Sequence, residues 1–167
     1  MRRRHLAWIL VANASAAHAE PSIKPKSGAA LCTALTPADF KSVGVANADK
    51  PKPNVSDGGA SAYCVYGGKS SATGGIELDV FHPAGANAKE AKATLDTAVG
   101  EGSSPMTPIK IAGADEAVWS AKAVSGGPPF ATIAVRRATL VFVIGIPTGK
   151  EAETQLRKLV ELVLKRL

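Results

Sequence analysis

Few residues of this chain have types and spacings that suit chemistry. Cys32 and Cys64 are its only cysteines, and their spacing differs from the C-x-x-C of redox proteins. With one distant histidine they also fall short of the four ligands of a structural zinc ion. In an oxidising compartment two cysteines predict one disulfide, which would close a loop of about 33 residues and destabilise the unfolded chain by about 3–4 kcal/mol.

A hydrolase built on this chain would have to use His82, because the other two histidines lie within the first 18 residues, in a segment expected to be removed. His82 stands at the end of a predicted strand beside Pro83, where it could border a cleft or face solvent. The serines lack the G-x-S-x-G setting of a nucleophile. A small periplasmic hydrolase using His82 is therefore the alternative to a non-enzymatic protein.

Two carboxylates, Glu77 and Asp79, lie on one face of a predicted strand, about 7 Å apart at their Cα atoms. This spacing suits a carboxylate pair or a calcium ion, and it also suits an ordinary solvated strand face. Residues 68–70 read Gly-Lys-Ser, but position 63 is tyrosine where a phosphate-binding loop needs its first glycine. We expect no cofactor and no metal ion.

Aromatic and basic side chains indicate a recognition surface, because aromatic rings and arginines are enriched where proteins bind ligands. The candidates are Tyr63, Tyr66, Trp119, Phe130, Arg136 and Arg137. Within this set, Tyr66, Trp119, Arg136 and Arg137 are the binding residues we predict, the two arginines as an anion anchor. The alternative places Trp119 in the core and makes the arginines the polar tip of a hairpin.

The first 19 residues predict a signal peptide. Arginines occupy positions 2–4, an apolar stretch covers positions 6–12, and Ala-His-Ala follows at positions 17–19 as a cleavage site. The apolar stretch is far shorter than the roughly 20 residues of a membrane span. Removal of this segment lowers Lys and Arg from 20 to 17 against 14 Asp and Glu, and the formal charge from +6 to +3. The chain is thus expected to be periplasmic or secreted, without a stable membrane span and without nucleic-acid binding.

The remainder, residues 20–167, fits one domain, with 46% hydrophobic and 20% charged residues over the whole chain. Thr36-Pro37 begins a short helix, with Asp39 near its positive end and Gly44 as its stop. An exposed loop is predicted over 46–62. Strands are predicted over 62–66, 76–81, 109–111, 117–121, 130–135 and 139–146.

Two further helices are predicted. Asn87 and Glu90 start one that ends near Val99. The other is C-terminal, with Thr148 and Glu151 as a capping box. Its apolar stripe consists of Leu156, Leu159, Val160, Val163, Leu164 and Leu167. The fold class is therefore α+β, a mostly antiparallel sheet of about five or six strands packed with two or three helices, including an amphipathic C-terminal helix.

Short motifs add a resemblance. Residues 32–39 read C-x-x-L-T-x-x-D, residues 63–66 read YCVY and residues 111–119 read IAGADEAVW. In this order, with an apolar hairpin and a C-terminal helix, the chain resembles small extracytoplasmic domains of bacterial envelope lipoproteins and sensor-type proteins, whose fold is similar to the PsbP-like α/β sandwich. The resemblance implies that fold and an envelope location, and it implies no catalytic residues. No lipid-attachment cysteine follows the leader, which suggests a soluble relative.

These observations together favour an exported, non-enzymatic protein. We expect it to bind an envelope protein or a small ligand through loops at one end of the sheet.

Overall fold

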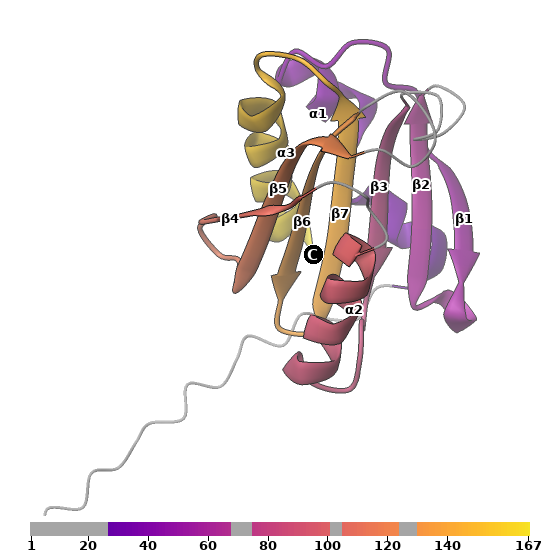
Figure 1. Ribbon diagram of the computed structural model, residues 1–167. Helices are drawn as coiled ribbons and strands as arrows, with labels where there is room; N and C mark the ends of the chain where they lie inside the picture. The colour runs from indigo at the N-terminus through magenta and orange to yellow at the C-terminus, as the bar shows by residue number, and fades with distance from the viewer. Residues whose placement is uncertain (1–26, 68–74, 101–104, 124–129) are drawn as a thin grey trace, which may run out of the picture.

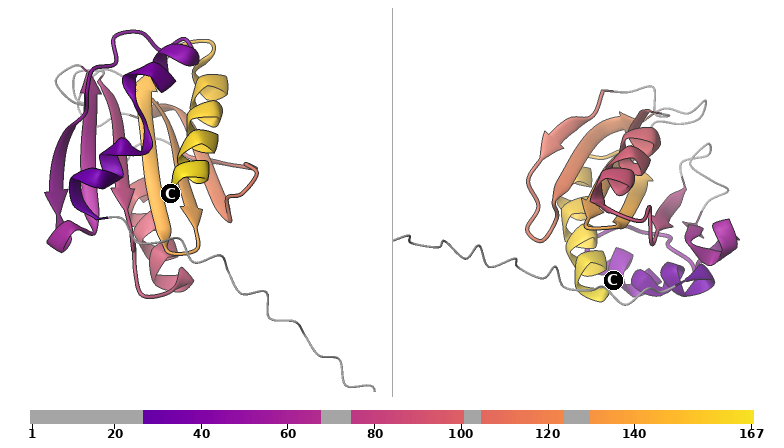
Figure 2. Two further views of the ribbon diagram at one scale, coloured as in Figure 1. Left: turned by 180° about the vertical axis from the view of Figure 1, so that it is seen from behind. Right: turned by 90° about the horizontal axis from the view of Figure 1, so that it is seen from below.

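The computed structural model describes residues 27–67, 75–100, 105–123 and 130–167. The predicted signal peptide, residues 1–19, lies outside these residues. The described chain forms one antiparallel sheet of seven strands in the order β1-β2-β3-β7-β6-β5-β4, with helices on both faces (Figures 1 and 2). The predicted α+β fold with a mostly antiparallel sheet is confirmed.

The sheet has two halves, β1-β2-β3 and β7-β6-β5-β4, which join where β3 pairs with β7. The strands are β1 (Lys52–Ser56), β2 (Ser61–Gly67), β3 (Ile76–Phe81), β4 (Thr107–Ile109), β5 (Glu116–Ala123), β6 (Phe130–Arg137) and β7 (Leu140–Pro147). In β3 apolar and polar residues alternate, and burial alternates with them, as the sequence predicts. The strand β7 is buried along most of its length, because it lies in the middle of the sheet with helices on either side.

The strand β1 corrects the sequence analysis, which predicts an exposed loop over 46–62. This strand pairs with β2 at the edge of the sheet, and every one of its residues is exposed. Since neither face is buried, its sequence carries no alternation of apolar and polar residues, and Pro53 argues against a strand except at an edge. The sheet therefore has seven strands rather than five or six.

The helical elements are the 3₁₀ turns η1 (Gly28–Ala34) and η2 (Asp57–Gly59) and the α-helices α1 (Pro37–Ser42), α2 (Ala88–Gly100) and α3 (Ala152–Arg166). Helix α3 packs on β6 and β7 from one side, and η1 lies on the same side against β2. Helix α2 packs on β6 and β7 from the other side. In the described chain no other helix lies on the α2 side, so this face of β1, β2 and β3 has no helix over it (Figure 1).

Helix α1 begins as predicted. Thr36 accepts a hydrogen bond from the Asp39 backbone, and the Asp39 carboxylate accepts one from the Thr36 backbone, at 2.7 Å. This carboxylate also receives two hydrogen bonds from Arg166, at 2.6 and 2.9 Å. Because Arg166 ends α3, the contact joins the C-terminal helix to the start of α1.

Helix α3 packs with the predicted apolar stripe against the sheet. Leu156, Leu159, Val160 and Val163 are fully buried. The predicted capping box is wrong, because Glu151 is the cap residue and makes no side-chain capping bond. The helix begins at Ala152, whose backbone N–H donates to the carbonyl of Gly149, so a turn and not a side chain satisfies this first amide.

The predicted disulfide is present and joins Cys32 in η1 to Cys64 in β2, with the Cα atoms 5.5 Å apart. Both residues are at most 1% exposed, within the larger apolar core between η1, α3 and the sheet. A smaller core lies on the α2 side, around Ala91 and Leu95. None of the helices in the described ranges is both long and apolar enough to cross a membrane.

Candidate functional site

The predicted binding residue Tyr66 lies in the larger core. Its side chain is 0% exposed, its hydroxyl donates to the Cys32 carbonyl at 2.6 Å, and its ring contacts Phe40. Burial raises the pKa of the Tyr66 phenol well above its usual value. In this structure Tyr66 therefore holds η1 against the sheet and offers no surface to a ligand.

Trp119 lies on the same face of the sheet as Tyr66, opposite Ile133 in the neighbouring strand, and packs partly buried against the larger core. Arg136 and Arg137 are consecutive in β6, so their side chains leave the sheet on opposite faces. Arg137 donates to the carbonyl of Leu164 near the end of α3, at 2.8 Å. The four predicted binding residues therefore lie apart from one another in the structure and form no common surface.

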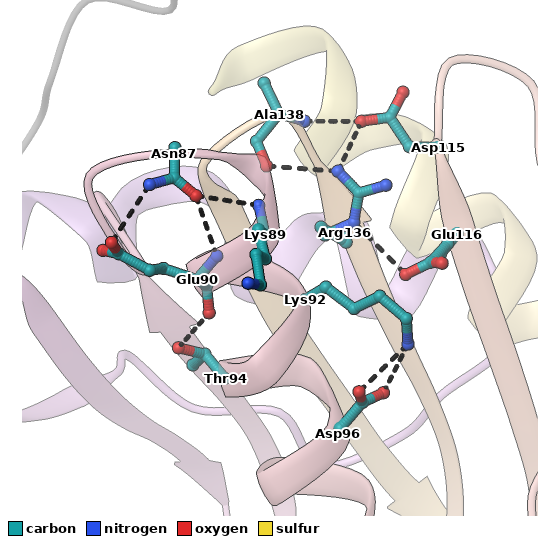
Figure 3. A network of polar contacts seen from close by, with 10 residues as sticks. All are labelled: Asn87, Lys89, Glu90, Lys92, Thr94, Asp96, Asp115, Glu116, Arg136 and Ala138. Atoms are coloured by element: carbon teal, nitrogen blue, oxygen red, sulfur yellow. Dashed lines mark hydrogen bonds and ion pairs between the residues drawn. The ribbon is translucent and has the colours of Figure 1, made fainter.

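Arg136 is held in a network of polar contacts (Figure 3). It donates to Glu116 at 3.2 Å and to Asp115 at 3.0 Å, and also to the carbonyl of Ala138. Asp115 in turn accepts from the Ala138 backbone N–H at 2.7 Å. Because Ala138 has a left-handed conformation with φ of 50°, these bonds fix the tight turn between β6 and β7. Arg136 therefore stabilises this turn, and we call its contacts with Asp115, Glu116 and Ala138 the turn clamp.

His82 is 3% exposed, at the end of β3, and its backbone N–H donates to the carbonyl of Ala60 at 2.7 Å. Its side chain is therefore buried. The sequence analysis had left two alternatives open, a position at the border of a cleft and a position facing solvent. His82 does not line the cavity described next.

A cavity of about 460 Å³ lies between α2 and the sheet. Its floor comes from β2, β3, β7 and β6, and its wall comes from α2. We call it the α2 cavity. The apolar part of its lining includes Phe81, Ala98, Val99, Met106, Phe130 and Val143. Several of these residues also belong to the smaller core, so the cavity continues that core towards the uncovered half of the sheet.

The acidic end of the cavity lies over β3, where Glu77 and Asp79 both face it. Tyr63 of β2 pairs with Asp79 across the strands, and its hydroxyl donates to Glu77 at 2.5 Å. The two carboxylates predicted to share a strand face therefore lie beside a phenol at one end of a largely apolar cavity. Within the described ranges they belong to no group of three or more acidic, histidine or cysteine side chains that could hold a metal ion.

Thr132 of β6 supplies a further polar group to the lining. The residue is 5% exposed, and its Oγ1 is buried without a hydrogen-bond partner among the described residues. A buried hydroxyl without a partner costs about 1–3 kcal/mol, so such atoms are few in folded proteins and call for an explanation. The residue lines the α2 cavity, but its Oγ1 atom itself has almost no accessible surface.

Gly145 of β7 lies between Thr132 and Glu77, because it is the register partner of both. A Cβ at this position would lie 3.1 Å from Cγ of Glu77 and 3.1 Å from a ring carbon of Phe130. Such contacts are tighter than ordinary van der Waals distances, so the glycine lets Glu77 lean over β7 towards Thr132. The predicted binding residues included neither Thr132 nor Gly145.

A second hollow, of about 500 Å³, lies on the other side of α2 against β4 and β5. Its charged residues include Lys92 and Asp96, which pair with each other at 2.8 Å, and Asp115 and Glu116, which pair with Arg136 (Figure 3). These contacts pair four of its five charged residues within the protein, and the fifth is Lys110. The α2 cavity, which has a large apolar part and an acidic end, is the candidate ligand site.

No protein-family model matches this chain, and no curated protein matches it.

Proposed function

We propose that this protein is an exported, non-enzymatic binding module that takes a small ligand into the α2 cavity. The observation that carries the proposal is a cavity of about 460 Å³ whose lining is mostly apolar, with Tyr63, Glu77 and Asp79 as polar groups at one end. Small-molecule sites typically have volumes of about 300–1,000 Å³, apolar walls and a few polar groups that orient the ligand. The α2 cavity agrees with this description in size and in composition.

Export is part of the proposal. The leader pattern of residues 1–19 and the Cys32–Cys64 disulfide both support it, because disulfides persist in oxidising compartments. The resemblance to extracytoplasmic envelope domains supports the same location. If the proposal holds, protein released by osmotic shock or found in the medium begins at Glu20. Recovery of a chain that starts at residue 1 from the cytoplasm would contradict it.

Binding in the α2 cavity is tested with an uncharged apolar dye, N-phenyl-1-naphthylamine, whose fluorescence rises in apolar surroundings. We expect a saturable, one-site titration with the wild-type protein. Ala98 is half-buried on the cavity side of α2, so Ala98→Phe fills the space and should weaken dye binding at least about tenfold.

The matched control is Ala93→Phe, on the exposed side of the same helix. It adds the same ring without filling the cavity and should leave the dye affinity unchanged. Equal weakening by both variants, or no saturable binding by the wild type, would overturn the proposed site. Circular dichroism spectra of both variants establish that they are folded.

A further inference from the structure

We propose that the ligand of the α2 cavity is an uncharged hydrophobic molecule, held beneath α2 by apolar contacts, rather than an amphiphilic ion such as a fatty-acid anion. This inference rests on the proposed binding function and goes further, because it names the chemical class of the ligand. Two observations carry it. Apolar side chains surround one part of the cavity floor, and the polar side chains of the lining are already engaged within the protein.

The apolar part of the cavity is the first argument. Ala134 of β6 and Val143 of β7 are register partners, so they lie side by side in the floor on the α2 side of the sheet. Phe81, Val99 and Met106 line the cavity around them, and these three side chains and that of Val143 are only partly buried. A hydrophobic body placed on this floor would remove its own surface and theirs from water, which is favourable without any polar contact.

The hydroxyl groups of the lining are the second argument. Thr94 of α2 donates to the carbonyl of Ala84 at 2.6 Å. Thr97 donates to the carbonyl of Ala93, one helical turn earlier, at 3.0 Å. Each hydroxyl has a single proton, so neither can donate to a ligand without breaking a bond within the protein. The Oγ1 atom of Thr132 has almost no accessible surface and is out of a ligand's reach.

The acidic end of the cavity is the third argument. The hydroxyl of Tyr63 donates to Glu77 at 2.5 Å, and Glu77 and Asp79 each have a further interaction within the protein. A cationic ligand would therefore have to compete with existing contacts of these carboxylates. An anionic ligand would approach two acidic groups, and the described residues of the lining include no Lys, Arg or His to pair with it. An uncharged ligand avoids both penalties.

The test compares three probes that share one hydrocarbon chain and differ in their polar end: octanol, octanoate and octylammonium. Displacement of N-phenyl-1-naphthylamine at pH 7 gives their affinities. We expect octanol to bind at least about tenfold more tightly than either ion, because each ion would lose hydration without gaining a free partner. Each added CH₂ group from hexanol to octanol should raise the affinity about fourfold. An ion that binds as tightly as octanol, or an affinity independent of chain length, would overturn the inference.

A charge added to the cavity provides a second test. Ala98→Lys introduces a cation on the cavity side of α2 and should raise the octanoate affinity at least about tenfold while lowering that of octanol. Thr97→Lys introduces the same charge at an exposed position of the lining, where it disturbs no buried packing, and should raise the octanoate affinity severalfold. The matched control, Ala93→Lys on the exposed side of α2, should change neither affinity. Circular dichroism spectra establish that the three variants are folded.

Failure of this inference is distinguishable from failure of the proposed function. Dye binding that Ala98→Phe abolishes, together with an ion that binds as tightly as octanol, would overturn the uncharged ligand and keep the cavity as a binding site. Absence of both dye and octanol binding would overturn both. Unchanged octanoate affinity in Ala98→Lys and in Thr97→Lys would also overturn the inference, because the lack of a cation would then not be what excludes the anion.

Discussion

The contact between Asp39 and Arg166 makes a prediction about stability and pH. The Arg166 guanidinium and the Thr36 cap lower the pKa of the Asp39 carboxyl from 3.8 to about 2. The carboxylate of Asp39 is 14% exposed and the side chain of Arg166 is 37% exposed. A shift of this size corresponds to about 2 kcal/mol, and the solvent around Arg166 reduces the expected contribution to about 1 kcal/mol.

The direction in which stability changes with pH follows from the lowered pKa of Asp39. The folded protein holds the charged carboxylate more favourably than the unfolded chain does, so the stabilisation is complete above about pH 5 and is lost as the pH falls towards 2. Asp39→Asn should therefore lower the free energy of unfolding by about 1 kcal/mol at pH 7, with about 2 kcal/mol as the upper limit. At pH 2.5 most of this difference should disappear, because the wild-type carboxyl is then partly protonated and that of the unfolded chain is fully so.

Urea unfolding followed by circular dichroism at pH 7, 5, 4, 3 and 2.5 measures the difference. The matched control is Asp96→Asn, which removes an exposed carboxylate paired with Lys92 on the surface of α2 and should leave the free energy of unfolding nearly unchanged. A difference between wild type and Asp39→Asn that stays the same from pH 7 to pH 2.5 would refute the reasoning, as would equal effects of the two substitutions.

Further predictions concern the disulfide, the core and the turn clamp. Replacing Cys32 and Cys64 together by alanine should lower the free energy of unfolding by about 3–4 kcal/mol in urea titrations, and a loss below 1 kcal/mol would contradict the loop-closure argument. Leu159→Ala removes a fully buried side chain of α3 and should reduce stability by about 2–5 kcal/mol, measured in the same way. Arg136→Gln should destabilise the protein by about 1–2 kcal/mol and leave the dye affinity unchanged. A weakened affinity at full stability would return Arg136 to a binding role.

The sequence predicts those parts of the fold in which local signals and burial agree. The stripe from Leu156 to Leu164 and the alternation in β3 each describe one buried face, and both elements form as predicted. The strand β1 is missed because it is an exposed edge strand that pairs with β2 without burying a side chain. The capping pattern of Thr148 and Glu151 matches a motif, but the turn at Gly149 supplies the first hydrogen bond of α3.

The candidate site is predicted less completely, because it depends on where α2 lies. Alternation in β3 places Glu77 and Asp79 on one face, and their acidic pair is recognisable from the sequence. That this face becomes the floor of a cavity follows only from the packing of α2 on β6 and β7. The one local signal for Thr132 is a hydroxyl within the apolar residues 130–135 of a strand. Nothing in the sequence separates the core residue Tyr66 from a surface tyrosine, because only the fold brings η1 over it.

A titration of the ¹⁵N-labelled protein with N-phenyl-1-naphthylamine, followed by amide chemical shifts, is the most direct test of ligand binding in the α2 cavity. We predict that the largest shifts map to Glu77, Thr132 and Ala98, around the cavity. Shifts centred on Trp119 and α3 would contradict the proposed site.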